Sequence, residues 1–373
     1  MDATYIIMWT GFILAGYAVV GNDSIQTLGT YLTSNEERPW YVLWAFAGSI
    51  LTATLVYGWW QYGGDVSYER LLGDGGLADP KYKDPRNMPL FGWPFLLPPL
   101  VLMLLTRTGI PVSTSFLILT FFAPKGLVDM TVKSLIGYVL AFIVAIVLYM
   151  LISKALERKF ITTPMKPENK RNWTILQWAS TGFLWSMWLI QDFANIFVYL
   201  PRSLTGVELT VSLVILLALL GYIFYSKGGK IQDIVRAKSN TDDVRSATII
   251  DATYGLLLLF FKEWNNIPMS TTWVFLGLLA GREIAIRLRL QNEPVTDYQV
   301  YSEHRAQIAR DMGGDVVLDA DRKPHPMHLG RDTYRMIGSD LAKVFLGLVV
   351  SILLVFIMRY LTTGTFMEVT GLN

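Results

Sequence analysis

Long apolar runs separated by short polar connections form the main pattern of this chain. A membrane-spanning helix needs about 20 largely apolar residues. We predict transmembrane helices at 4–33, 38–60, 128–153, 174–200, 207–226 and 338–362. The first and fourth of these runs carry polar residues near their middle, so we expect both helices to be broken at bilayer depth.

Two further apolar runs, 91–123 and 248–286, are each cut in the middle by a proline and a cluster of hydroxyl residues. Each half is too short to cross a bilayer alone, so we interpret both runs as re-entrant helical hairpins. Interrupted backbone is tolerated in lipid only where it lines a cavity or packs inside protein. The alternative interpretation is that each run forms two ordinary, short, tilted spans.

The composition also indicates a membrane protein. Of 373 residues, 52% are hydrophobic and 17% are charged, and the mean hydropathy is +0.38. A soluble domain of this length needs more charge to cover its surface. The net charge of +2 gives no reason to expect a nucleic-acid partner, and the absence of cysteine excludes disulfides and thiolate metal sites. We therefore expect an all-α, multi-pass protein of the lipid bilayer, in the plasma (inner) membrane.

The polar connections indicate the orientation of the chain. The segments 154–173 and 227–247 are rich in lysine and arginine and should be cytoplasmic, whereas 61–90 is more acidic and fits the outside. Both chain ends then lie outside, and the two hairpins enter the membrane from opposite sides. This is the arrangement that an inverted repeat requires.

Three landmarks occur twice in the same order, which indicates an internal duplication. The pairs are Asp23 and Asp192, Gly63-Gly64 and Gly228-Gly229, and Pro111 and Pro268, separated by 169, 165 and 157 residues. Duplicated discontinuous helices are a pointer to a transporter site at the bilayer midplane. The predicted segments are a first inverted repeat at 1–153, a cytoplasmic linker at 154–173, a second repeat at 174–286, a polar cytoplasmic loop at 287–337, and a final span with the C-terminal tail at 338–373.

Asp23 and Asp192 are the two deepest acids, one in each repeat. An aspartate at membrane depth costs at least roughly 2–3 kcal/mol and marks a functional site by default. Carboxylates accompanied by amide oxygens suit a hard cation such as sodium. The alternative is that each aspartate only caps a helix. The predicted sodium ligands are Asn22, Asp23, Gln191, Asp192 and Asn195.

The two hydroxyl clusters supply the other half of a site. Each follows a proline that ends one helix, and each should begin the next helix, because serine and threonine are N-cap residues. A helix N-terminus presents free N–H groups and a positive dipole end, which bind anions. Two facing ends would hold a tetrahedral anion, and bound cations would offset the two carboxylates, which couples the two ligands. The predicted anion-binding residues are Asp23, Gln26, Ser113, Thr114, Ser115, Asp192, Asn195, Ser270, Thr271 and Thr272.

These motifs resemble the inorganic phosphate transporter (PiT) family, whose signature Gly-Ala-Asn-Asp-Val-Ala-Asn occurs in both halves. Residues 20–26 keep the Asn-Asp pair, and residues 189–195 keep the Asp and the final Ala-Asn. The family's Pro-Val-Ser-Thr-Thr hairpin tips are similar to residues 111–115 and 268–272. The resemblance covers about residues 5–286, and the final span fits it too.

The resemblance implies uptake of inorganic phosphate by a homodimer, coupled usually to sodium and in some bacterial members to protons. The sequence departs from the signature at Gln26, Gln191 and Ser115. A permease for sulfate or another oxyanion on the same fold therefore stays an alternative, as does proton coupling. Phosphate is favoured because near neutral pH it keeps a proton and can donate a hydrogen bond to a carboxylate.

An intramembrane aspartyl protease also pairs two membrane aspartates, but it does not predict two hydroxyl-bearing hairpins at repeat spacing. The Gly-x-Gly-Asp motif of such proteases is absent from the sequence. A passive anion channel needs no buried carboxylates at its anion site. We therefore predict a transporter without catalytic residues and without a cofactor other than sodium as the coupling ion.

Overall fold

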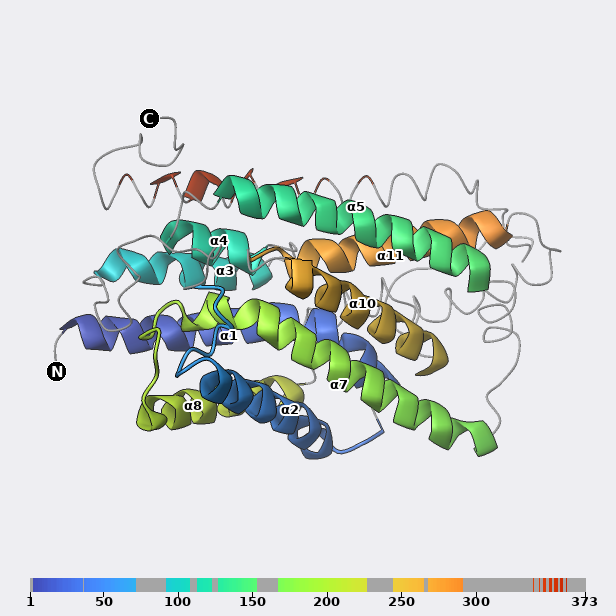
Figure 1. Ribbon diagram of the computed structural model, residues 1–373, viewed down its shortest axis with the longest axis horizontal. Helices are drawn as coiled ribbons and strands as arrows, with labels where there is room; N and C mark the ends of the chain where they lie inside the picture. Colours follow the sequence, from blue (N-terminus) through green and yellow to red (C-terminus); the bar gives the residue numbers. More distant parts are fainter. Residues whose placement is uncertain are drawn as a thin grey trace, which may run out of the picture.

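The computed structural model describes residues 3–35, 37–71, 92–107, 113–122, 127–152, 167–226, 244–264 and 268–290, with isolated positions between 338 and 360. Regular structure in these ranges is entirely helical, as predicted (Figure 1). The elements are α1 (Ala3–Ser34), α2 (Trp40–Gln61), the 3-10 helix η2 (Trp93–Leu96), α3 (Leu97–Arg107), α4 (Thr114–Phe122), α5 (Leu127–Ile152), α7 (Pro167–Phe197), α8 (Gly206–Tyr225), α10 (Val244–Trp264) and α11 (Thr271–Leu290).

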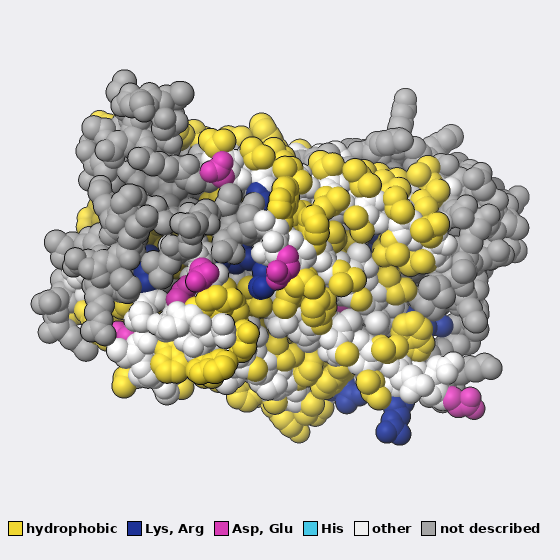
Figure 2. Space-filling view, in the orientation of Figure 1, with side chains coloured by type: hydrophobic (Ala, Val, Ile, Leu, Met, Phe, Trp, Pro, Cys, Tyr) yellow, Lys and Arg dark blue, Asp and Glu magenta, His cyan; other side chains and the backbone are white. Residues whose placement is uncertain are grey.

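Within the described ranges, five helices are long and apolar enough to cross a membrane: α1, α2, α5, α8 and α10. Their outward faces are hydrophobic. On α5 the exposed side chains Val132, Val139, Ile143 and Val147 recur at helical spacing, and Figure 2 shows hydrophobic side chains over much of the described surface. A continuous apolar surface of this kind is stable against lipid rather than water. The protein is therefore an integral, multi-pass membrane protein.

The prediction that the first and fourth spans are broken is wrong. α1 runs without interruption past Asp23, and α7 runs past Asp192. The hydroxyl groups around Asp23 bond to their own helix: Ser24 Oγ donates to the carbonyl oxygen of Val20, and Thr27 Oγ1 donates to that of Asp23 over 2.7 Å. Hydroxyls that bond one turn back are compatible with a continuous helix, so polarity at this depth does not interrupt the backbone.

α7 also begins earlier than the predicted start at 174, at Pro167, and so takes in the end of the predicted linker. Proline fits the first position of a helix, where the N–H group would have no partner, and Glu168 places negative charge in the first turn. α7 is not among the helices apolar enough to cross a membrane, because polar residues are spread along its length.

Each of the two predicted hairpin runs contains a pair of helices, and the second helix of each pair begins at the hydroxyl cluster (Figure 1). The connections 108–112 and 265–267 lie outside the described residues, and re-entry into the membrane stays a prediction. α3 and α4 are short, with 11 and 9 residues. α10 and α11 are longer, with 21 and 20 residues, and α10 is long enough to cross a bilayer. The expectation that each half is too short to cross alone is therefore wrong for α10, which begins at Val244, ahead of the apolar run.

The two helix pairs approach each other from opposite ends of the bundle. α3 and α4 lie toward the N-terminal end of α1, and α10 and α11 lie toward its C-terminal end (Figure 1). The first residues of α4 and of α11 lie near the middle of the bundle. Entry of the two hairpins from opposite sides of the membrane stays a prediction. The inverted duplication itself, and the segment boundaries drawn from it, stay predictions.

α11 packs closely along α5 through two glycines. A Cβ atom added to Gly277 would lie 2.4 Å from the carbonyl oxygen of Tyr138, and one added to Gly281 would lie 2.3 Å from that of Phe142. Small residues four positions apart let two membrane helices approach at backbone distance. The contact holds α11 against α5, and this fixes the position of the turning point where α11 begins.

Several predicted features lie outside the described residues. They are Pro111, Gly228-Gly229, the connection 227–243, the loop at 291–337 and most of the final span, together with the side chains of Asn22 and Gln26. Residues 287–290, assigned from the sequence to the polar loop, belong to α11.

Candidate functional site

The starts of α4 and α11 touch inside the protein. We call residues 113–116 the first tip and residues 268–273 the second tip. Ser115 Oγ donates a hydrogen bond to the carbonyl oxygen of Met269 over 3.2 Å. The rings of Phe116 and Trp273, one from each tip, have centroids 5.5 Å apart. The α5 residue Ser134 accepts a hydrogen bond from the backbone N–H of Ser270 over 2.9 Å. Two segments that are distant in the sequence thus form one buried cluster.

The two tips begin their helices in the same way. The Oγ of Ser113 accepts a hydrogen bond from the N–H of Phe116 over 3.3 Å, and the Oγ of Ser270 accepts one from the N–H of Trp273 over 3.3 Å. The predicted serine caps are therefore confirmed. Each cap satisfies the N–H group at the third helical position, so the N–H groups at the first two positions have no partner within their own helix. Such groups bind anions at helix N-termini.

Asp192 lies beside both tips. Asn195, one turn further along α7, donates from Nδ2 to Asp192 Oδ1, and also to Thr114 Oγ1 over 3.1 Å. The hydroxyl groups of Ser115 and Thr271 lie beside the same carboxylate. The predicted placement of Asp192 and Asn195 on one helix face is present, and it joins α7 to the first tip.

Two amide oxygens on α7 are buried without a hydrogen-bond donor in the described part of the chain: Oε1 of Gln191 and Oδ1 of Asn195. The other end of Gln191 is fixed, because its Nε2 donates to the carbonyl oxygen of Leu258 over 3.1 Å. A buried acceptor without a partner costs roughly 1–3 kcal/mol, and a bound cation would supply the missing interaction. Amide and carboxylate oxygens suit sodium, so Gln191, Asp192 and Asn195 fit a cation site.

Asp23 is fully buried on α1 and belongs to the same region. The link is Tyr254 of α10, whose phenol group interacts electrostatically with both Asp192 and Asp23. Its hydroxyl donates to the carbonyl oxygen of Thr271 over 3.0 Å. The two acids therefore lie around the second tip. The predicted residues gathered in this cluster are Asp23, Ser113, Thr114, Ser115, Gln191, Asp192, Asn195, Ser270, Thr271 and Thr272.

Two buried cations of this cluster were missed by sequence reasoning. Arg70 is 1% exposed, and its Nε donates to the carbonyl oxygen of Ile190 over 2.9 Å. Its guanidinium interacts electrostatically with Asp192, and Lys133 of α5 interacts with Arg70. The prediction that bound cations alone offset the two acids is therefore incomplete, because the protein supplies positive charge of its own.

The segment that follows α2 holds Arg70 in place. Asp65 accepts hydrogen bonds from the N–H groups of Ser67, over 2.7 Å, and of Glu69, over 2.8 Å. Tyr68 and Glu69 have φ angles of 55° and 63°, a left-handed conformation that costs a residue other than glycine about 1–2 kcal/mol. This fixed turn directs the next side chain, that of Arg70, into the interior.

A third buried acid, Asp251 of α10, joins three helices. Thr30 of α1 donates to its Oδ1 over 2.7 Å, and Thr181 of α7 donates to its Oδ2 over 2.5 Å. Asp251 lies in the apolar run 248–286, so the criterion that selected Asp23 would also have selected it. Both carboxylate oxygens have hydroxyl donors, and this makes Asp251 a polar contact between α1, α7 and α10.

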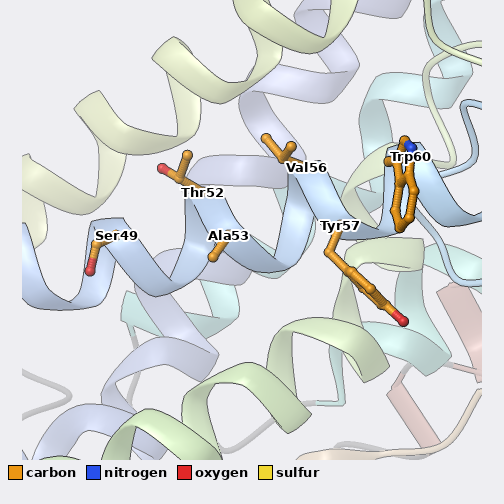
Figure 3. Close-up of a pocket in the computed structure, with 6 residues that line it drawn as sticks. All are labelled: Ser49, Thr52, Ala53, Val56, Tyr57 and Trp60. Carbon is orange, nitrogen blue, oxygen red and sulfur yellow. The ribbon is translucent and has the colours of Figure 1, made fainter.

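A groove of about 550 Å³ on the protein surface is unrelated to this cluster. Its lining residues are Ser49, Thr52, Ala53, Val56, Tyr57 and Trp60 (Figure 3). All belong to the outer face of α2, where Tyr57 is 54% and Trp60 is 72% exposed. A face of this kind contacts lipid. The buried polar cluster between the helix tips is therefore the candidate site.

No protein-family model matches the chain, and no curated protein matches it. A solved structure described as "The sodium-dependent phosphate transporter" is similar in fold, with a TM-score of 0.53 and 14% sequence identity. The match covers 84% of this chain and 99% of that chain. At this level of identity the likeness concerns the fold. The fold therefore agrees with the family resemblance drawn from the motifs, and membership of that family stays a prediction.

Proposed function

We propose that this protein is a secondary transporter that imports inorganic phosphate together with sodium, by alternating access. The observation that carries the proposal is the contact between the two hydroxyl-bearing helix tips beside Asp192. The tips provide N–H and hydroxyl groups for a tetrahedral anion, and α7 provides carboxylate and amide oxygens for a cation. The similarity in fold to a structure described as a sodium-dependent phosphate transporter supports this assignment.

The closeness of the two kinds of ligand accounts for coupling. Gln191 and Asn195 offer oxygen atoms to a cation, and Asn195 also donates to Thr114 of the first tip. An anion at that tip would lie near the Asp192 carboxylate, and a buried contact between like charges costs several kcal/mol. A sodium ion bound by α7 removes that cost, so each ligand raises the affinity for the other.

Burial of the site supports alternating access. Asp23, Asp192 and Asn195 have no exposed surface, and the tip residues Ser113 and Thr271 are 4% and 2% exposed. A transporter must expose such a site to each side in turn. The Ser115–Met269 hydrogen bond joins the two tips, so we propose that opening separates them. We also propose a homodimer, on the family resemblance alone.

Phosphate is the proposed anion because Asp192 can accept a hydrogen bond from a phosphate hydroxyl. Sulfate has no proton at neutral pH and would place bare oxygens against the carboxylate. A site that recognises its ligand by a hydrogen bond discriminates strongly against analogues that lack it. In a competition experiment, excess arsenate should block uptake of labelled phosphate and excess sulfate should not. Equal inhibition by sulfate would contradict phosphate as the preferred substrate.

The central experiment is uptake of labelled phosphate into proteoliposomes that contain the purified protein. A sodium gradient should drive accumulation above the external concentration, and a potassium gradient of the same size should not. Accumulation driven by a pH gradient without sodium would instead show proton coupling. Counterflow separates the other classes, because a channel gives no accelerated exchange and a protease gives no flux.

A further inference from the structure

We propose that Arg70, supported by Lys133, is a fixed anion-binding residue of the site, so that the substrate is held by a protein cation as well as by helix N-termini. This inference rests on the proposed function and specifies how the oxyanion is recognised. The starting observation is that Nη1 of Arg70 is buried without a hydrogen-bond partner in the described part of the chain. A buried guanidinium donor without an acceptor is costly, and an oxyanion supplies the acceptor.

The position of Arg70 places this free donor at the candidate site. Its Nε is anchored to the carbonyl oxygen of Ile190, two residues before Asp192 on α7, and the guanidinium interacts electrostatically with the Asp192 carboxylate. Ser115 and Thr271, one from each tip, lie beside that carboxylate too. Arg70 therefore approaches the meeting point of the tips from the side of α7.

The neighbouring charge also favours a bound anion. Lys133 of α5 is 3% exposed and acts electrostatically on Arg70, and two like charges repel strongly in a low-dielectric interior. Lys133 is next in the chain to Ser134, which accepts the hydrogen bond from the backbone of the second tip. A doubly charged oxyanion near both cations would offset their repulsion. A guanidinium group can also donate two parallel hydrogen bonds to two oxygens of one phosphate.

The backbone holds Arg70 rigidly, which supports a binding role. Two consecutive left-handed residues, Tyr68 and Glu69, precede it, and Asp65 fixes the turn through two backbone N–H groups. The turn is also bonded to the connection between α7 and α8, because the N–H of Leu204 donates to the carbonyl oxygen of Gly64 over 3.0 Å. Strained conformations persist where the surrounding structure enforces them, and they concentrate at ligand-binding sites.

The test compares wild type with Arg70→Gln and with Arg202→Gln as the matched control. Arg202 is also a buried arginine, but its Nη1 donates to the carbonyl oxygens of Phe197, the last residue of α7, and of Val198 and Leu200 just beyond it. These bonds give Arg202 a structural role. Two quantities are measured on purified protein: the rise in melting temperature caused by sodium chloride alone, and the additional rise caused by inorganic phosphate. Uptake in proteoliposomes gives the half-saturating phosphate concentration.

For Arg70→Gln we expect the sodium-dependent rise to persist, the phosphate-dependent rise to disappear, and the half-saturating phosphate concentration to increase at least about tenfold, as for loss of a charge-assisted hydrogen bond. Arg202→Gln should lower the melting temperature without ligands and leave the half-saturating phosphate concentration unchanged. If the half-saturating phosphate concentration of Arg70→Gln lies within about twofold of the wild-type value, the inference is overturned.

If Arg70→Gln does not fold, Arg70→Lys decides the matter. Lysine keeps the charge but lacks the planar fork, so phosphate binding should still weaken at least about fivefold, and unchanged binding would overturn the inference. If the proposed function itself is wrong, the result is different: the wild-type protein would show neither a phosphate-dependent rise in melting temperature nor uptake of phosphate.

Discussion

Ser115 donates a hydrogen bond to the carbonyl oxygen of Met269 across 154 residues of sequence, over 3.2 Å. This bond joins the tips of the two hairpin-like helix pairs, and the caps Ser113 and Ser270 orient both tips in the same way. Neither helix pair forms the site alone, because each contributes only one of the two helix N-termini. The site therefore depends on how the two pairs meet.

Removing the Ser115 hydroxyl should weaken the contact between the two tips, because it removes the hydrogen bond to Met269. We expect Ser115→Ala to raise the half-saturating phosphate concentration about 3- to 10-fold, which corresponds to loss of one hydrogen bond of about 1 kcal/mol. Ser212→Ala is the matched control, because Ser212 is also buried but donates to the carbonyl oxygen of Leu209 within α8. Initial rates of uptake in proteoliposomes measure both variants. Equal effects of the two substitutions would show that Ser115 has no special role.

If the proposed function is right, replacing either acid should abolish the dependence of phosphate uptake on sodium. Asp192→Asn and Asp23→Asn should each abolish sodium-dependent uptake and leave a folded protein, because an amide offers a cation no negative charge. Asn at position 192 keeps an oxygen that can accept from Asn195, so the local hydrogen bond is preserved. Size-exclusion profiles check folding, and uptake with and without sodium checks coupling. Uptake near the wild-type rate in either variant would make that acid structural.

Gln191 should affect the cation rather than the anion. Gln191→Met removes the buried Oε1 that has no donor, together with the Nε2 bond to Leu258. We expect the half-saturating sodium concentration to rise about fivefold or more, as for loss of one ligand oxygen worth roughly 1 kcal/mol. The half-saturating phosphate concentration, measured at saturating sodium, is the internal control and should change little. If only the half-saturating phosphate concentration changed, Gln191 would belong to the anion site and not to the cation site.

The glycine contact between α11 and α5 should be sensitive to a single methyl group. In Gly277→Ala the new Cβ would lie 2.4 Å from the carbonyl oxygen of Tyr138, and a shift of the helices should cost about 1–3 kcal/mol. Gly206→Ala is the control, because a Cβ atom there would meet no atom within 4 Å. Melting temperatures in detergent should fall for the first variant and stay unchanged for the second. No difference between them would show that α11 can move freely away from α5.

The sequence determined the membrane class, the all-α fold and most of the candidate site. Asp23, Asp192 and the two serine caps were recognisable because a polar residue in an apolar run is rare and therefore informative. Arg70 lies in the polar segment 61–90, where a charged residue is ordinary. Its role became visible only when the turn at Tyr68 and Glu69 was seen to direct it inward.

Tertiary structure also decided which helices are continuous. From the sequence, Asp23 and its hydroxyl neighbours predicted a break in α1, but Ser24 and Thr27 donate to carbonyl oxygens one turn back and the helix continues. The polar residues in a sequence show which side chains need hydrogen bonds. They do not show which groups will be the partners. The partner of Ser115 is 154 residues away, and only packing of the two helix pairs brings them together.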